Sequence, residues 1–145
     1  MTTIEFRLQV EDVGGDDAVT VTPYIAGESL VELARRVEAG PAAAGGEPDL
    51  AGAYAGLIVG DYPWREWYSG RSPQVWFGDG DSCVLGCTCG TTGCWPLTTM
   101  ITIGDREVGW AHFRTGHRSW DLSDLGPFRF DRGAYDHALQ HPARI

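Results

Sequence analysis

The chain has 145 residues, of which 43% are hydrophobic and 21% are charged, and its formal net charge at pH 7 is −9. This composition is that of one soluble globular domain with enough residues to bury its own hydrophobic core. Because 20 acidic residues outnumber 11 basic ones, the charge argues against nucleic acid and anionic membranes as partners. It would suit a protein partner with a basic surface.

The first ten residues alternate apolar and polar side chains and include Glu5 and Arg7. A signal peptide would instead have a basic start followed by an unbroken apolar stretch, and no apolar run in the chain approaches the ~20 residues of a membrane span. These features predict a cytoplasmic protein with reduced thiols. The chain contains no lysine and no asparagine, and we interpret this absence of A-rich codons as the sign of a GC-rich bacterial genome.

Two strands and a helix are expected in the N-terminal part of the chain. The segments with the alternating, β-branched pattern of strands are 3–10 and 18–25. A helix is expected to begin at a capping box formed by Ser29 and Glu32, because apolar residues follow at helical spacing. Gly40 and Pro41 are expected to end this helix, and residues 40–49 have the composition of a flexible loop.

The rest of the chain is expected to be mainly antiparallel β-structure. Residues 50–58 could form a short helix, and an aromatic loop follows at residues 62–68. The segments that indicate four further strands are 74–78, 82–89, 95–103 and 106–114. Their short connections permit only antiparallel pairing, so they predict a four-strand meander, and Asp131 is expected to cap a last helix, 132–140. The sum is a single α+β domain over residues 1–145, with an antiparallel sheet of about six strands and two or three helices.

The four cysteines have the spacing C-x3-C-x-C-x4-C and are Cys83, Cys87, Cys89 and Cys94. Side chains alternate along a strand, so the first three would share one face. Gly90 and Gly93 permit a tight reversal of the chain, which returns Cys94 to the level of Cys89. Three thiolates therefore converge, and thiolates are ligands that select zinc and other soft or borderline ions.

A tetrahedral zinc site needs four ligands, and the source of the fourth is open. Cys83 lies ~13 Å from Cys87 along a straight strand, so it joins only if the strand bends, for which Gly86 is the expected place. Otherwise the fourth ligand is a histidine, a carboxylate or water, with His112 and His117 as the first candidates. The alternatives to a metal site are reduced cysteines packed as small hydrophobic groups, a disulfide or redox pair, and a cysteine nucleophile.

The C-x-C-x4-C spacing of residues 87–94 resembles the zinc knuckle that follows the catalytic domain of SET-type methyltransferases. That knuckle also takes three cysteines from a short run and its fourth ligand from elsewhere, so the resemblance implies a zinc-binding geometry and no activity. The wider segment 87–97, C-x-C-G-x-x-G-C-W-P-L, together with Trp120-Asp121 and residues 125–128, is similar to a family of bacterial proteins with no established function. This second resemblance implies no mechanism.

Two further groups of residues are candidates for binding or chemistry. Trp64 and Trp67, with Arg65 between them, could hold a planar or sugar ligand by stacking and cation–π contact, with His117 as an additional ligand contact. The simpler interpretation is that these rings cover the sheet as part of the core. The segment from His112 to Asp121 collects polar groups near one strand end, where a histidine with an aspartate could serve acid–base chemistry, although a charged surface loop would have the same composition.

The sequence therefore favours a small, non-catalytic bacterial protein of the cytoplasm, in which a cysteine-rich hairpin forms a structural zinc site and the chain acts by binding a partner. One alternative is a thiol- or metal-dependent enzyme that uses a cysteine with His112 or His117. The other alternative is a small-ligand or peptide binder that uses the aromatic loop, residues 62–68.

Overall fold

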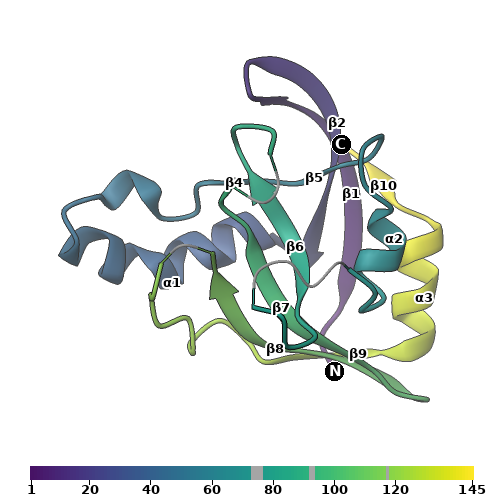
Figure 1. The fold of residues 1–145 in the computed structure, drawn as a ribbon. Helices are drawn as coiled ribbons and strands as arrows, with labels where there is room; N and C mark the ends of the chain where they lie inside the picture. Colours follow the sequence, from purple (N-terminus) through teal and green to yellow (C-terminus); the bar gives the residue numbers. More distant parts are fainter. Residues whose placement is uncertain (73–76, 92–93, 117) are drawn as a thin grey trace.

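The computed structural model describes residues 1–72, 77–91, 94–116 and 118–145. This part of the chain contains ten strands, three helices and one 3-10 turn. This is an α+β fold, as predicted (Figure 1). The strands are β1 (Ile4–Val13), β2 (Asp16–Ile25), β3 (Glu28–Ser29), β4 (Tyr54–Ala55), β5 (Leu57–Ile58), β6 (Ser82–Cys87), β7 (Leu97–Ile103), β8 (Glu107–Thr115), β9 (Phe128–Asp131) and β10 (Ala143–Arg144). The helical elements are α1 (Leu30–Ala44), the 3-10 turn η1 (Pro48–Leu50), α2 (Trp64–Trp67) and α3 (Arg132–Gln140).

The first sheet is built on a long hairpin of β1 and β2. The two strands pair along their full length, so the predicted strands 3–10 and 18–25 are confirmed and both extend toward the turn. Gly14 and Gly15 form that turn with φ values of 68° and 93°, and glycine adopts such positive values without a steric penalty. β3 and β5 also pair with β2, and β10 runs parallel to β1.

The second sheet has the strand order β4-β6-β7-β8-β9. The four strands from β6 to β9 follow one another along the chain and pair antiparallel, so they form a meander. Three of its strands correspond to the predicted segments 82–89, 95–103 and 106–114, and the fourth is β9. The remaining predicted strand, 74–78, falls mostly on residues 73–76, which lie outside the described part of the chain.

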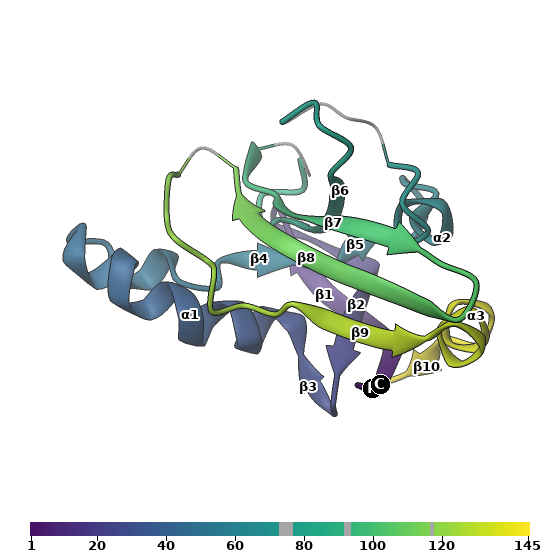
Figure 2. The ribbon, with the colours of Figure 1, turned by 90° about the horizontal axis from the view of Figure 1, so that it is seen from below.

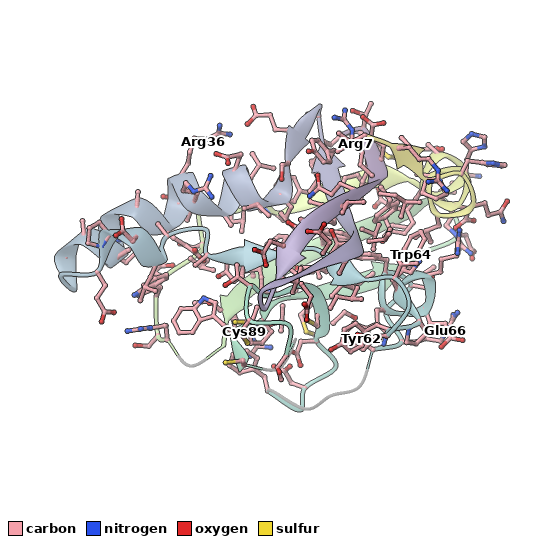
Figure 3. All side chains as sticks on the ribbon, turned by 90° about the horizontal axis from the view of Figure 1, so that it is seen from above. Arg7, Arg36, Tyr62, Trp64, Glu66 and Cys89 are labelled. Atoms are coloured by element: carbon pink, nitrogen blue, oxygen red, sulfur yellow. The ribbon has the colours of Figure 1, made fainter. Side chains whose placement is uncertain are left out.

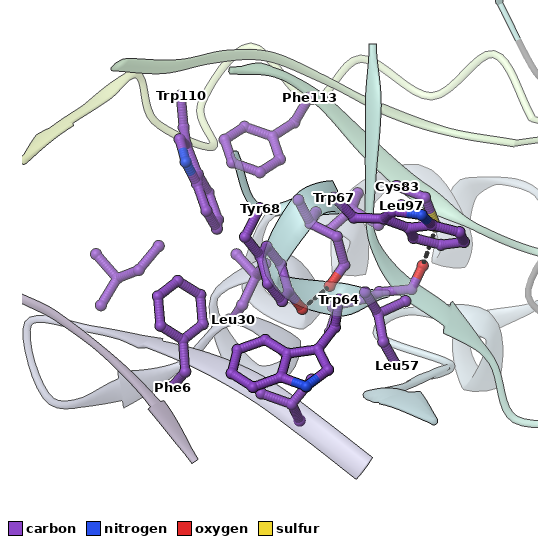
Figure 4. Packing of buried hydrophobic residues seen from close by; sticks show 14 of the residues in the cluster. Phe6, Leu30, Leu57, Trp64, Trp67, Tyr68, Cys83, Leu97, Trp110 and Phe113 are labelled. Atoms are coloured by element: carbon purple, nitrogen blue, oxygen red, sulfur yellow. Dashed lines mark hydrogen bonds between the residues drawn. The ribbon is translucent and has the colours of Figure 1, made fainter. Parts of the chain in front are cut away.

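The hydrophobic core lies between the two sheets, which are stacked as layers with α1 and α3 at opposite ends (Figure 2). Tyr68 is fully buried in this core, and its ring lies 4.8 Å from that of Phe6 in the first sheet and 5.9 Å from that of Trp110 in the second (Figure 4). Its hydroxyl donates to the carbonyl oxygen of Val84 at 2.8 Å. The core therefore buries a large aromatic side chain while satisfying its polar atom.

The helix α1 begins as predicted and ends later than predicted. The Ser29 hydroxyl accepts a hydrogen bond from the Val31 amide at 3.2 Å, which is the expected cap. The prediction that Gly40 and Pro41 end the helix is wrong, because the helix continues through both of them to Ala44. Burial of Ala42, which is 1% exposed, holds the last turn against the protein and outweighs the low helix propensity of glycine and proline. The expected loop at 40–49 is accordingly helical over 40–44 and 48–50.

The short helix predicted for residues 50–58 is also wrong. Apart from the end of η1, the regular structure of this segment consists of β4 and β5, each of two residues, which pair with β6 and β2. Gly56 between them comes so close to β2 that an added Cβ would lie 2.5 Å from the carbonyl oxygen of Val21. Tertiary packing therefore determines the structure of this segment against its local helical pattern. The predicted last helix is confirmed as α3, where the Asp131 carboxylate accepts from the Ala134 amide at 2.9 Å.

Candidate metal centre

Three cysteine thiols meet in the connection between β6 and β7. Cys87 is the last residue of β6, and Cys89 and Cys94 lie in the connection itself. The Sγ atoms of the three residues all lie within 4.8 Å of one another. This confirms the predicted convergence. A tetrahedral zinc site needs sulfur atoms roughly 3.8 Å apart, so a contraction of about 1 Å would bring the three thiolates to one ion.

Backbone hydrogen bonds fix the path of this connection. The Cys89 amide donates to the Cys87 sulfur at 3.5 Å, and the Gly90 amide donates to the Cys87 carbonyl oxygen at 3.2 Å. The Cys94 amide donates to the Thr91 carbonyl oxygen at 2.9 Å. Gly90 has a φ of 93°, which is the left-handed backbone for which the sequence required a glycine. An amide that points at a sulfur atom favours its thiolate form, which is the form that binds metal.

The tip of the β1–β2 hairpin holds the cysteine connection in place from above (Figure 1). The Gly14 amide donates to the Thr88 carbonyl oxygen at 2.8 Å. Gly14 lies so close to the connection that an added Cβ would be 2.4 Å from the Cys89 carbonyl oxygen. On the other side, Tyr54 of β4 pairs with Cys87. The sequence pattern did not reveal the Gly14 contact, because the glycine pair at positions 14 and 15 is equally well explained by the hairpin turn alone.

The three thiols differ in exposure and in acidity. Cys87 is partly buried, and burial is the main reason why its pKa rises to about 11. Cys89 is exposed (Figure 3), and a hydrogen bond with the Thr91 backbone is the main reason why its pKa lies below the ordinary value. Cys94 is exposed as well. Cys89 is therefore expected to lose its proton before Cys87 and to bind a metal ion first.

The fourth cysteine lies apart from this group. Cys83 is 6% exposed, and its thiol donates to the Leu85 carbonyl oxygen at 3.2 Å (Figure 4). Burial raises the pKa of Cys83 to about 12. A bulge does occur in β6, but it lies between Cys83 and Leu85 rather than at Gly86, and it leaves this thiol in the core. Cys83 was predicted to be the fourth ligand only if a bend in the strand brings it to the other thiols. The geometry does not meet this condition.

Of the two histidine candidates, the structure describes only His112, and His112 does not complete the site. His112 is exposed on β8 and is not a member of the group around the three thiols. His117 lies outside the described residues. Among the residues that the structure describes, the group contains three thiols and no histidine or carboxylate. A fourth ligand from water or from a partner molecule would give zinc its usual four-coordinate geometry.

The aromatic loop, the second candidate site, is part of the core. Trp64 and Trp67 on α2 are 4% and 8% exposed. Arg65 donates through Nε to the Leu139 carbonyl oxygen at 2.8 Å, and its guanidinium carbon lies 4.3 Å from the centre of the Trp64 ring. Figure 3 labels Trp64 together with Tyr62 and Glu66 of the same segment. Because both tryptophan rings are enclosed by protein, they are not free to stack on a ligand, and the geometry favours the core interpretation.

The comparisons with protein-family models, with curated proteins and with solved structures find no significant match to this chain. None of the helices in the described part of the chain is long and apolar enough to cross a membrane. The function therefore has to be inferred from the geometry and chemistry of the three-thiol site.

Proposed function

We propose that the chain is a non-catalytic bacterial protein of the cytoplasm that binds one zinc ion through Cys87, Cys89 and Cys94 and uses the metal-bound surface to bind a protein partner. The observation that carries the proposal is the approach of the three Sγ atoms to within 4.8 Å of one another. Thiolates select zinc and similar ions over magnesium or calcium. Two of the three residues are exposed, so the ion would lie at the surface with its fourth position accessible.

The role of the metal would be structural. The connection that carries the thiols lies between β6 and β7, and its described path depends on a few turn hydrogen bonds and on the contact with Gly14. A surface segment with so few contacts is expected to open readily. A zinc ion with three ligands from eight consecutive residues would cross-link the segment and give a partner a defined surface.

Charge supports a basic partner. The hairpin tip that contacts the thiol connection carries exposed Asp12, Asp16 and Asp17, and the whole chain has a net charge of −9. Three thiolates with one Zn²⁺ would add a further negative charge at the same place. An acidic surface of this kind attracts a partner with a basic surface and accelerates its association.

Metal analysis of protein purified without a polyhistidine tag tests the proposal. We expect about one equivalent of zinc per chain, with Cys87, Cys89 and Cys94 protected from a thiol reagent until a chelator is added. Less than about a tenth of an equivalent of zinc or iron, together with free reaction of these three thiols before any chelator is added, would contradict it. Cys83 is the internal reference, since its burial slows its reaction with or without metal.

A thiol-dependent enzyme is the second candidate function, and the lowered pKa of exposed Cys89 favours it. Alkylation kinetics separate the two candidates. A catalytic thiolate reacts fast at neutral pH in the protein as purified, whereas a zinc-bound thiolate reacts fast only after the metal is removed. We therefore expect a chelator to increase the alkylation rate of Cys89 by about tenfold or more. An unchanged rate would favour the enzyme.

The contact of Gly14 with the thiol connection leads to a prediction with a matched control. Gly14→Ala is expected to lower the zinc affinity by about tenfold, because the new Cβ would force the Cys89 carbonyl oxygen away. Gly15→Ala also places an alanine in the left-handed region, but an added Cβ there has no atom within 4 Å. Calorimetric zinc titrations of both variants check this. Equal affinities in the two variants would show that the hairpin tip does not position the thiols.

A further inference from the structure

A cavity with a volume of about 480 Å³ lies beside β8, and none of the three thiols lines it. It lies between one edge of β8 and the segment that leads to β9. β9 pairs with β8 only over Glu107–Trp110, so on that side residues 111–115 of β8 have no strand partner among the described residues. The cavity has the size of typical small-molecule sites. Its lining residues are Ala111, His112, Phe113, Arg114, Trp120, Asp121, Leu122, Ser123, Leu125 and Pro127.

His112 stands in an unusual backbone conformation at this cavity. The pairing of β7 with β8 shifts between Thr98 and Met100, so the single residue Thr99 lies opposite His112 and Phe113. In this bulge His112 has a φ of 60°, which is costly for any residue with a Cβ. Bulges turn a side chain away from the regular alternation of the strand, and strained backbone is concentrated at functional sites.

The floor of the cavity is apolar. Phe113, Leu122 and Leu125 line it and are all less than 5% exposed. Trp120 also lines the cavity, and it is held in place by a perpendicular contact with Trp95 at 6.1 Å. A floor of leucine and phenylalanine with an indole beside it favours a ring as the buried part of a ligand.

Among the described residues that line the cavity, one negative charge has no ion-pair partner. The Arg114 guanidinium donates to the Asp79 carboxylate at 2.7 Å and lies 3.8 Å from the centre of the Phe77 ring, so its charge is already compensated. Asp121 is exposed and accepts a hydrogen bond from the Ser123 amide at 2.9 Å. Hydrogen bonding with the Ser123 side chain, and then with the Ser123 amide, holds the pKa of Asp121 below its ordinary value. In the described part of the chain no basic side chain forms an ion pair with Asp121.

We propose that this cavity is a binding site for a small aromatic amine, with the ring on the apolar floor and the ammonium group paired with Asp121. The His112 imidazole supplies a hydrogen-bonding group at the cavity for a substituent of the ring. The site is separate from the three thiols, so it stands whether or not the chain binds zinc.

Calorimetric titration with tyramine tests the proposal on the full chain, with a chelator present so that no metal at the thiols contributes. Two further probes separate ring from charge: 3-(4-hydroxyphenyl)propionate has the same ring with a negative charge, and butylamine has the charge without the ring. We expect saturable binding of tyramine with a Kd below about 1 mM, and affinities at least about tenfold weaker for both other probes. Equal binding of the propionate, or no saturable binding of tyramine up to about 5 mM, would overturn the proposal.

A pair of variants then locates the binding. Asp121→Asn keeps an oxygen that can accept from the Ser123 amide but removes the charge, and it is expected to weaken tyramine binding by about tenfold or more. Asp124→Asn changes an exposed residue of the same segment that does not line the cavity, and it is expected to leave the affinity unchanged. Amide chemical shifts provide a second readout. We expect tyramine to perturb residues 111–114 and 120–123, and perturbations confined to other residues would refute the assignment.

The backbone of His112 gives a stability prediction at the same site. His112→Gly is expected to leave the urea midpoint of unfolding nearly unchanged, because glycine adopts the positive φ without strain. His112→Val is expected to lower the urea midpoint by about 1 M relative to the glycine variant, since a β-branched residue tolerates this backbone least. Urea unfolding measures both. Equal stabilities would mean that residue 112 does not hold this conformation in solution.

Discussion

Replacing Cys94 with serine is expected to lower the zinc affinity of the protein by about 100-fold. The binding of structural zinc by four ligands provides about 10–16 kcal/mol, so the loss of one thiolate removes about 3 kcal/mol. Cys94 is exposed, so the change has little effect on packing. Without the Cys94 thiolate the metal ion no longer cross-links the two ends of the connection, because Cys94 is the ligand farthest along the chain from Cys87. Competition with a chromophoric chelator measures the affinity, and the circular dichroism of the metal-free variant should match that of the metal-free parent protein.

Cys83→Ser is the matched control for this experiment. The thiol of Cys83 lies in the core and donates to the Leu85 carbonyl oxygen, a bond that a serine hydroxyl can also make. We expect an unchanged zinc affinity and a loss of stability of about 1 kcal/mol from burying a more polar group. If Cys83→Ser loses zinc as strongly as Cys94→Ser, the fourth cysteine is a ligand and the three-thiol site is incorrect.

The second large effect is expected at a carboxyl group buried beneath α1. Glu38 has no exposed surface. Its carboxylate accepts from the Gly52 amide at 2.8 Å and from the Tyr54 hydroxyl. The Tyr54 hydroxyl also lies 2.8 Å from the hydroxyl of Thr115 in the second sheet. Hydrogen bonds through Glu38 and Tyr54 thus connect α1, the segment before β4 and the meander. Glu38→Ala would leave the Gly52 amide without this partner and the Tyr54 hydroxyl with only that of Thr115, and it is expected to cost about 3 kcal/mol of stability, measured by urea unfolding.

The same carboxyl group makes stability depend on pH. Burial is the main reason why the pKa of Glu38 lies above its ordinary value of 4.5, against the opposing effect of its two hydrogen bonds. Because the folded state binds this proton more tightly than the unfolded state, the contribution of Glu38 is fully present below the unfolded value and is lost as pH rises through the folded pKa. Glu38→Gln keeps the shape without the titration. The stability of Glu38→Gln relative to the parent protein is expected to increase between about pH 4 and pH 8, and a constant difference would contradict the assignment.

Local sequence patterns were sufficient to predict the elements that form the centre of the fold. The alternation in 3–10 and 18–25 and the glycines between them predicted the β1–β2 hairpin, since a hairpin depends only on its own strands and turn. The same applies to β6, β7 and β8 and to the cap of α3 at Asp131. The three thiols were predicted for the same reason. Their spacing and the glycines around them are local, so strand period and turn chemistry could place them.

The predictions failed where distant parts of the chain determine the structure. α1 passes through Pro41 because Ala42 is buried, and no local pattern shows what covers Ala42. Glu38 belongs to the same row as Leu30 and Ala34 at intervals of four residues, which placed it on the buried face. That row was the sequence signal that could have predicted the burial of Glu38. A charged residue, however, normally indicates the exposed face of a helix. The partners that make its burial possible, Gly52 and Tyr54, lie in a segment whose predicted helix does not form.

The contact between Gly14 and Thr88 has a consequence for how the protein is made. Residue 14 leaves the ribosome 74 residues before residue 88, and the β1–β2 hairpin needs no later part of the chain to pair its own strands. The residues that receive the cysteine connection are therefore already synthesised when the cysteines emerge. Docking onto residues that are synthesised first shortens the time that three neighbouring reduced thiols spend in non-native arrangements. In such arrangements, oxidation to a wrong disulfide competes with metal binding. The N-terminal hairpin would in this way act as a template for the late-emerging thiols during translation.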